Sequence, residues 1–371
     1  MVTRAFSTVN KTLLNLAKFG ISFGLIAYLV ADPDNREAFT KLAGQPKDWA
    51  TLALAWLACL SAVMLTFVRW YILVRALDLP FSMKDAFRLG FLGYLLNFVS
   101  LGNVGGDLFK AVFIAREQPG RRAEAVATVV LDRVIGLYML FVLASAAIIA
   151  TGLWNTQLEQ IRIICQGTLL ATGMGFVAIL ILLIPGITQG GFSGFLERVP
   201  RVGPLFGRLL GAIRLYRQRL DRLLLAALLS LGVHSLSSLG IYLVAQGLPG
   251  EVPPMADHFV IVPLAMVTGV LPLPMNGLGA FEGVVDFLYR HVPVNFPVNV
   301  GRGLAVCVGY RAITLLIAMV GVGYYLASRR EVVELIHDAE ADEIGSANTG
   351  RAPRGEMTEG AMGAEPAVGI R

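Results

Sequence analysis

Apolar segments long enough to cross a lipid bilayer follow one another along this chain, and one stretch between them breaks the pattern. Residues 97–116, NFVSLGNVGGDLFKAVFIAR, carry two asparagines, three glycines, an aspartate and a lysine. A second polar, glycine-rich stretch, LPLPMNGLGAFEG, occupies residues 271–283. In the hydrocarbon core, irregular backbone is tolerated only where other protein covers it or where it lines a water-filled cavity. The fold must therefore shelter two interruptions of this kind.

The composition fixes the broad class of the protein. Of its 371 residues, 56% are hydrophobic and only 15% are charged, whereas soluble domains average about 25% charged residues. We therefore predict a polytopic α-helical membrane protein. The net charge of +5 comes from arginines and lysines in short loops between apolar segments, where they set orientation and meet anionic lipid. We expect no nucleic-acid partner.

Six segments are predicted to span the membrane completely. The basic loops at residues 75–88, 116–123 and 186–222 should face the cytoplasm together with both termini. Residues 206–220 place leucines opposite arginines at helical spacing, which indicates an interfacial helix. Residues 331–371 are predicted to form a disordered cytoplasmic tail. The predicted spans are 13–30, 49–74, 124–151, 167–184, 223–248 and 303–327.

The two polar stretches join arms that are too short to cross a bilayer core of about 30 Å alone. The arms cover residues 85–100 and 108–115 in the first case, and 258–271 and 278–291 in the second. With basic loops inside, the first pair must enter from the cytoplasm and the second from the opposite side.

The predicted fold is thus an all-α polytopic domain over residues 1–330. It has about six full spans plus two opposed re-entrant or broken helical hairpins. Units 49–151 and 223–327 form an inverted repeat, an architecture typical of transporters.

Three charged residues fall inside predicted spans, namely Asp132, Arg133 and Arg311. A charge within the membrane is costly and marks a functional site by default. One interpretation is structural, with Arg133 paired to Asp107 or Asp132 and Arg311 paired to Glu282, so that each hairpin is fixed to its neighbour. The other interpretation places these arginines on a substrate path. The two interpretations are compatible with each other.

The glycine-rich tips have two interpretations as well. Helix arms that end inside the membrane present free N–H groups and a positive dipole end, which suit an anion, and Lys110 adds a flexible cation. Taken singly, each tip could instead be a tight turn or a close helix contact, and Asn276 could cap the following arm. We predict His234 to be a hydrogen-bonded packing residue. The predicted substrate-binding residues are Asn103, Gly105, Gly106, Asp107, Lys110, Asp132, Arg133, Asn276, Gly277, Gly279, Glu282 and Arg311.

Signatures of catalysis are missing from the sequence. No catalytic triad, HExxH motif, paired carboxylates or nucleotide-binding loop occurs. Cys59, Cys165 and Cys307 form no metal-binding pattern and are interpreted as packing residues. We therefore expect no enzyme activity, no cofactor and no metal.

Three motifs carry a resemblance to a known family. GNVGGDLFKAVFIARE at residues 102–117, VVLDRVIGL at 129–137 and LPLPMNGLGAFEG at 271–283 resemble the lysylphosphatidylglycerol synthase transmembrane-region family, also called the flippase-like domain. The resemblance covers about residues 10–330. It implies movement of a phospholipid or a lipid-linked glycan between leaflets. Full-length enzymes of that family continue into a soluble aminoacyl-transferase domain, which we do not expect in this chain, so lysyl transfer is not implied.

The functional hypothesis is a translocator in the cell (inner or plasma) membrane for a lipid with an anionic headgroup. The headgroup would meet Arg133, Arg311 and Lys110 between the hairpins, and Asp107 and Glu282 would orient these cations. One alternative is a non-transporting scaffold whose partner is a membrane-bound lipid-modifying enzyme or glycosyltransferase. Another alternative is a secondary transporter of small solutes.

Overall fold

The computed structural model describes residues 44–99, 104–183, 216–270, 278–293 and 300–327, together with residues 24, 27, 31, 40 and 296. The elements formed by these residues are all helical. The chain divides into two units, Met1–Ser328 and Arg329–Arg371, and the described residues belong to the first. The predicted span 13–30 and the predicted interfacial helix 206–220 lie largely outside the described residues, and the predicted tail 331–371 lies wholly outside them.

Among the described residues, five helices are long and apolar enough to cross a membrane. They are α3 (Trp49–Ala76), α6 (Arg122–Thr151), α7 (Glu159–Leu183), α11 (Leu220–Gly247) and α15 (Arg302–Ala327). Short 3₁₀ turns, η1 (Leu153–Asn155) and η2 (Arg217–Arg219), precede α7 and α11. The chain is therefore a multi-pass membrane protein, as the composition predicts.

One predicted boundary is wrong. The sequence predicts a span that begins at residue 167, after a loop, but α7 already begins at Glu159. Its first turns bury Ile161 and Cys165, and Gln166 donates a hydrogen bond to the carbonyl of Trp154. Packing of these few apolar side chains extends the helix into a segment whose polar residues resemble a loop.

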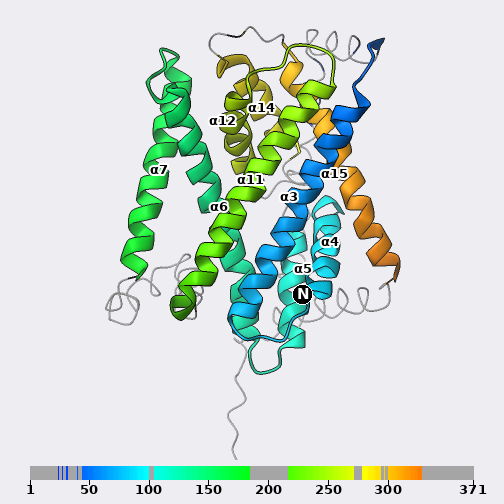
Figure 1. Cartoon of the computed structure of the whole chain (residues 1–371), viewed down its shortest axis with the longest axis vertical. Coiled ribbons are helices and arrows are strands. Elements are labelled where there is room, and N and C mark those ends of the chain that lie inside the picture. Colours follow the sequence, from blue (N-terminus) through cyan, green and yellow to red (C-terminus); the bar gives the residue numbers. More distant parts are fainter. Residues whose placement is uncertain are drawn as a thin grey trace, which may run out of the picture. The chain divides into compact units, whose positions relative to one another are not determined.

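Four helices are too short to cross the membrane alone, as predicted. They are α4 (Met83–Val99), α5 (Val104–Glu117), α12 (Met255–Met266) and α14 (Ala280–His291), and η3 (Val267–Val270) extends α12. The longest has 17 residues, or about 25 Å at 1.5 Å per residue. In Figure 1, α4 and α5 lie beside the lower half of the bundle, whereas α12 and α14 lie near its upper end. The order long, short, short, long therefore occurs twice, with the short pairs toward opposite ends.

The start of α5 departs from the predicted arm at residues 108–115. The helix begins at Val104, so Gly105 and Gly106 belong to it rather than to a turn. The reason is close packing of α5 on α4: a Cβ atom on Gly106 would lie 2.1 Å from the carbonyl oxygen of Gly93. Only glycine allows the two backbones to approach this closely.

The long helices α3 and α11 pack side by side at the centre of the bundle (Figure 1). Glycines on α11 make this possible, since a Cβ on Gly240 would lie 2.5 Å from Sγ of Cys59 and one on Gly247 would lie 2.7 Å from Cγ of Leu52. The backbone N–H of Asp48 also donates to the carbonyl of Gly247 at 3.0 Å. The first helices of the two sets are thus joined along their length.

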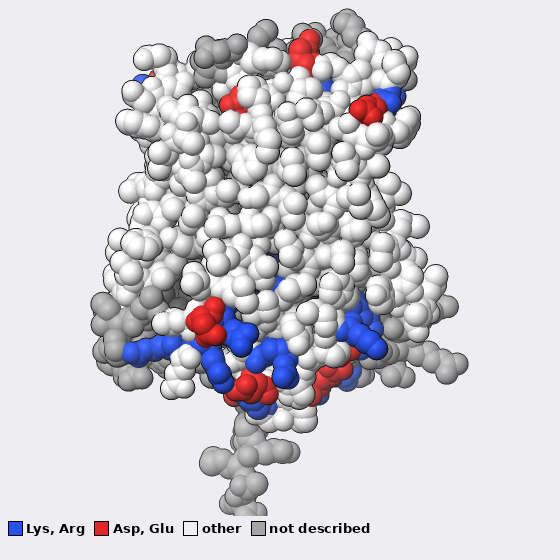
Figure 2. Space-filling model, in the orientation of Figure 1, with Lys and Arg blue, Asp and Glu red and all other residues white. Residues whose placement is uncertain are grey.

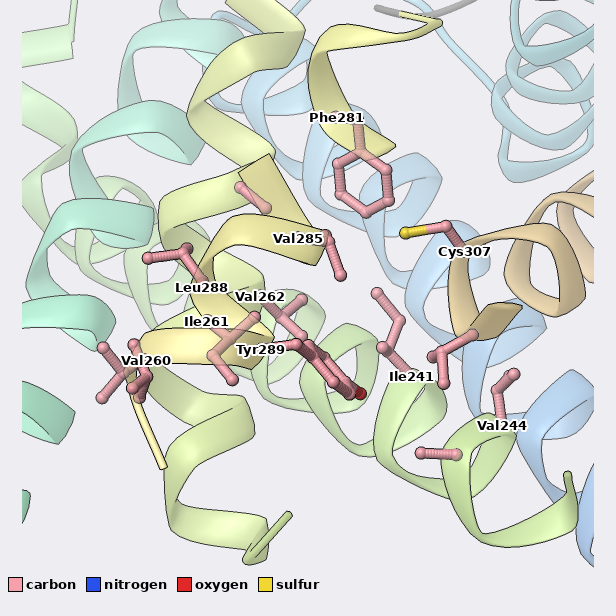
Figure 3. Packing of buried hydrophobic residues seen from close by; sticks show 14 of the residues in the cluster. Ile241, Val244, Val260, Ile261, Val262, Phe281, Val285, Leu288, Tyr289 and Cys307 are labelled. Atoms are coloured by element: carbon pink, nitrogen blue, oxygen red, sulfur yellow. The ribbon is translucent and has the colours of Figure 1, made fainter. Parts of the chain in front are cut away.

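The largest group of buried apolar side chains holds the second short pair in place. Figure 3 shows residues of α12 and α14 converging on α11 and α15. Within it, His258 on α12 donates through Nδ1 to the Pro254 carbonyl, so its Nε2 accepts the Tyr289 hydroxyl of α14 at 2.6 Å. The labelled members are Ile241, Val244, Val260, Ile261, Val262, Phe281, Val285, Leu288, Tyr289 and Cys307.

On the face shown in Figure 2, a broad band in the middle is nearly free of charge, and lysines and arginines gather at its lower end. Basic residues also stand at the ends of several helices. They are Arg75 at the end of α3, Arg116 in the last turn of α5, and Arg121, Arg122, Arg217, Arg219 and Arg222 near the starts of α6 and α11.

Candidate functional site

A cavity of about 490 Å³ lies within the bundle and is lined by both pairs of short helices. Asn97 and Asp107 contribute from the first pair, and Thr268 and Phe281 contribute from the second. Its volume is in the range of small-molecule sites, about 300–1,000 Å³. The charged side chains that line it are Arg69, Asp107, Lys110, Asp132, Arg133 and Arg311. The two interruptions of the apolar pattern therefore share one polar space.

Two deeply buried charges that line the cavity are Arg69 on α3 and Asp132 on α6. Arg69 donates from Nε and Nη2 to the two carboxylate oxygens of Asp132, at 2.7 and 2.9 Å. Its Nη1 donates to Oγ of Ser230 on α11 at 2.8 Å. Both charged residues are less than a tenth exposed. This fork-shaped pair fixes three long helices to one another.

Sequence reasoning missed Arg69 as a member of the site. The aromatic residues beside it, Trp70 and Tyr71, resemble an interfacial belt. The position of Arg69 within the span could have identified it as an intramembrane charge. About 10 Å of helix separates it from Ala76 at the end of α3. Asp132 therefore pairs with Arg69, whereas the sequence offered Asp132 as one of two partners for Arg133.

The other predicted ion pairs are present. Arg133 on α6 donates from Nη2 to Asp107 on α5 at 2.5 Å, and its Nε contacts the second carboxylate oxygen. Arg311 on α15 donates from Nε to Glu282 on α14 at 2.6 Å. Each pair joins the second short helix of a set to the long helix that follows it, which is the structural interpretation made from the sequence.

The burial of the two pairs differs. The Arg311 side chain is 18% exposed and that of Glu282 is 4% exposed, and the Arg311 guanidinium lies 5.6 Å from the ring centroid of Phe281. The Arg133 side chain, in contrast, is 48% exposed. Arg133 is therefore the more accessible of the two arginines, and it lines the cavity.

The backbone amides at the two tips are already engaged by the protein. The Gly106 N–H donates to Oδ1 of Asn97 at 3.0 Å, and the Gly279 N–H donates to Oε2 of Glu282 at 2.7 Å. Gly279 has a φ of 88°, a conformation that favours glycine at the start of α14. These contacts correspond to the turn and packing roles that the sequence left open, so neither amide is used in the function proposed below.

Lys110 is the cation of the cavity that differs from the rest. Its Nζ lies 5.4 Å from the ring centroid of Trp70 and 5.7 Å from that of Phe67, distances typical of cation–π contacts. Among the described residues, it forms no ion pair and donates no hydrogen bond. Each arginine of the cavity forms an ion pair with a carboxylate. Among the described residues, Lys110 instead lies against aromatic faces and interacts with Asp107 and Asp132 without forming an ion pair.

The predicted site residues divide into three groups. Asp107, Lys110, Asp132, Arg133 and Arg311 line the cavity, and Glu282 lies behind it against Arg311. His234 lines it too, and its Nε2 donates to the Gly136 carbonyl at 2.8 Å, as expected of a hydrogen-bonded packing residue. Gly105, Gly106 and Gly279 are described but are not among the lining residues. Asn103, Asn276 and Gly277 lie outside the described residues.

These features define a class: a helical integral membrane protein with a charged cavity enclosed by spanning helices and two pairs of short ones. The chain belongs to the family described as lysylphosphatidylglycerol synthase TM region, whose model matches residues 15–321. This membership links the protein to lipid handling. A search of curated proteins found no match to the chain.

Proposed function

We propose that the protein moves lipids with an anionic headgroup between leaflets, with the headgroup in the cavity and the acyl chains in the surrounding bilayer. The observation that carries the proposal is Lys110, a cation that lines the cavity without a carboxylate partner among the described residues. Membership of a lipid-related family supports the same class of substrate.

The charge balance of the site supports an anionic ligand. Arg69, Arg133 and Arg311 are each matched by one carboxylate, so Lys110 leaves the site with one surplus positive charge. A charge inside the membrane costs several kcal/mol unless it is compensated. A single phosphate group would compensate it, and it would do so only while bound.

An entry route for the headgroup is offered by Arg133. It lies about 16 Å along α6 from Arg122, at 1.5 Å per residue, and its side chain is half exposed. Leu108, which follows its ion-pair partner Asp107 in the chain, is exposed as well and does not line the cavity, as expected of a lipid-facing position. The planar guanidinium matches phosphate oxygens. We infer that a headgroup first meets Arg133 at the lipid boundary and then Lys110 inside.

Transport through such a site requires access from both leaflets. We propose that the two sets of helices, α3 to α6 and α11 to α15, are the halves of an inverted repeat that open the cavity in turn. The two short pairs, which lie toward opposite ends of the bundle, support this arrangement. The basic ends shown in Figure 2 would face the cytoplasm, with both termini on the same side, in the cell membrane.

The proposal is tested by leaflet exchange in proteoliposomes. Vesicles would carry an acyl-labelled fluorescent phosphatidic acid, and dithionite would quench only the outer leaflet. The purified protein should expose the inner-leaflet probe to quenching. Lys110→Ala should slow this exchange by about tenfold or more, because the lost charge contact is worth at least about 1.4 kcal/mol.

Lys84→Ala provides the matched control. Lys84 is an exposed lysine in the first turn of α4 and lies outside the cavity lining, so its loss should leave the rate unchanged. Exchange no faster than in protein-free vesicles, or equal rates for the two lysine variants, would refute the proposal.

A further inference from the structure

One histidine at the cavity has a buried ring nitrogen without a partner. His234 on α11 lines the cavity, and its Nε2 lies 2.8 Å from the carbonyl oxygen of Gly136. A carbonyl oxygen can only accept, so Nε2 carries the proton and Nδ1 of the neutral ring has a free lone pair. Nδ1 is buried and forms no hydrogen bond with the residues that the structure describes. His234 therefore holds an unused proton acceptor inside the bundle.

The depth of His234 makes this acceptor unusual. α11 runs from Leu220 to Gly247, so about 20 Å of helix separates His234 from either end. Ionisable side chains in the middle of a span are costly, and they mark substrate paths and proton relays by default. The hydrogen bond to Gly136 accounts for one ring nitrogen only, so packing does not explain Nδ1.

A second unpartnered group lies one turn further along α11. The hydroxyl oxygen of Ser238 is buried and has no hydrogen-bond partner among the described residues. Residues four apart are neighbours on a helix surface, and side chains lean toward the helix N-terminus, so Ser238 leans toward His234. Ser230 and Ser237, in contrast, each donate to the carbonyl four residues earlier. The Ser238 hydroxyl can therefore accept a hydrogen bond from Nδ1 when that nitrogen is protonated.

The cations around the ring oppose a further positive charge. Arg69 on α3 lies close by, since a Cβ on Gly136 would lie 3.1 Å from its Nη1, and Lys110 carries the surplus charge of the cavity. Without an anion, burial and these cations favour the neutral ring of His234. The other charged residues of the lining are Asp107, Asp132, Arg133 and Arg311, with Tyr94 and Tyr310 beside them, and the titratable residues of α12, Asp257 and His258, lie at its start outside the lining.

An anion in the cavity changes this balance. Its negative charge offsets the surplus charge on Lys110, and a nearby opposite charge favours the protonated form of a histidine. The positive charge of an imidazolium is shared by both nitrogens, so it is felt wherever the ring of His234 lines the cavity. Anion binding and proton uptake should therefore strengthen each other, and by linkage they do so by the same factor.

We propose that His234 takes up a proton together with the anionic headgroup, so that the protein moves protons and lipid as one load. The proton comes from water, forms an N–H bond at Nδ1 that donates to Ser238, and returns to water when the lipid leaves. The inference rests on the proposed function for the anion and adds a second, ionic substrate. A proton gradient across the membrane would then bias the direction of lipid movement.

Titration calorimetry on the full-length protein in detergent tests this coupling. The probe is dihexanoyl phosphatidylmethanol, whose phosphodiester carries one negative charge and has no group that titrates near neutral pH. Binding is measured in buffers with different enthalpies of ionisation, because the observed heat then changes in proportion to the protons taken up. The wild-type protein should take up protons on binding and should bind the lipid about fivefold more tightly at pH 6 than at pH 8, which is the lower end of typical couplings.

Three variants locate the proton. His234→Gln should abolish both the proton uptake and the pH dependence, because the amide can still donate to the Gly136 carbonyl but does not titrate. Ser238→Ala should reduce the uptake and leave the affinity at pH 8 unchanged, as expected of a positioning residue. His291→Gln is the matched control: His291 lies in the last turn of α14 and outside the cavity lining, so its loss should change neither quantity. Unchanged melting temperatures would verify folding.

Three results would overturn the inference: binding without proton uptake in the wild-type protein, as expected if His234 and Ser238 hold only a water molecule; a pH dependence that survives His234→Gln; or no binding of the lipid. Binding is measured without a bilayer, so proton-coupled binding by a protein that exchanges no lipid would refute the proposed function alone. Lipid exchange by a protein that binds without proton uptake would refute this inference alone.

Discussion

At the scale of residues, the pair Arg69–Asp132 should dominate stability among the ion pairs of the site. Both side chains are buried, and the guanidinium is shared by a carboxylate and a serine on different helices. Removing one partner of a buried pair leaves an uncompensated charge, which costs about 3–5 kcal/mol. Asp132→Ala should therefore lower the free energy of unfolding by about 3 kcal/mol or more, as measured by denaturation in detergent micelles.

The matched control is Asp221→Ala. Asp221 contacts Arg222 at the start of α11, and both side chains are more than half exposed, so their pair is worth at most about 1 kcal/mol. Equal losses of stability in the two variants would show that burial of Arg69 and Asp132 does not set their energetic weight.

A second prediction at this scale concerns Asp48, which caps the start of α3 outside the membrane. The Thr51 hydroxyl donates to its carboxylate at 2.6 Å, and the amides of Thr51 and Ala50 donate as well. These bonds lower the pKa of Asp48 below its ordinary value of 3.8. A lowered pKa in the folded state gives stability that is present above the unfolded-state pKa and lost as pH falls through the folded-state pKa.

The melting temperature should therefore be higher in the wild-type protein than in Asp48→Ala at pH 7. The difference should shrink as pH falls below about 4. A difference that stays constant between pH 7 and pH 3 would contradict this role for the carboxylate.

The sequence predicted ion pairs correctly where the only consideration was that a charge inside a span needs a partner. Arg311–Glu282 follows from the high cost of an unpaired charge in a span. For Arg133 the same argument left Asp107 and Asp132 as possible partners, and the structure selects Asp107. Arg69–Asp132 was missed, because the aromatic neighbours of Arg69 give it the appearance of an interfacial residue although it lies about two turns from the end of α3.

At the scale of elements, the short helices could be predicted because their length excludes crossing the membrane. The contacts that these short helices make with one another could not be predicted from the sequence. Whether a glycine forms a turn or a helix contact depends on what lies opposite, and for Gly106 the structure places the Gly93 carbonyl there. The cap that Asn97 gives to α5 is likewise a contact between two helices, which periodicity does not reveal.

Gly106→Ala tests this helix contact. The added methyl would lie 2.1 Å from the Gly93 carbonyl oxygen and 2.6 Å from Oδ1 of Asn97, so α4 and α5 must separate. Overpacking of this kind costs about 1–3 kcal/mol. The change should lower the melting temperature and also slow lipid exchange, since Asn97 and Asp107 line the cavity on either side of the contact.

Gly173→Ala is the control for helix propensity. Gly173 lies on α7 with nothing within 4 Å of the added atom, so alanine there should be neutral or stabilising by up to about 1 kcal/mol. A Gly106→Ala variant as stable as this control would show that α4 and α5 do not depend on close contact.

At the scale of the whole molecule, the all-helical class, the long spans and the two short pairs follow from length and hydropathy. Length and hydropathy do not show that both short pairs line one cavity, because this depends on how helices far apart in sequence pack together. The family supports lipid handling, and we propose the cavity as the location of the headgroup and a negative charge on that headgroup.

The most direct test of this account is the charge selectivity of exchange. Phosphatidic acid and phosphatidylcholine with the same labelled chain would be followed separately in otherwise identical proteoliposomes. The account predicts that the wild-type protein moves the anionic lipid at least about tenfold faster than the zwitterionic one, and that Lys110→Gln abolishes most of this preference. Equal rates for the two lipids in the wild-type protein, or a preference that Lys110→Gln leaves intact, would contradict it.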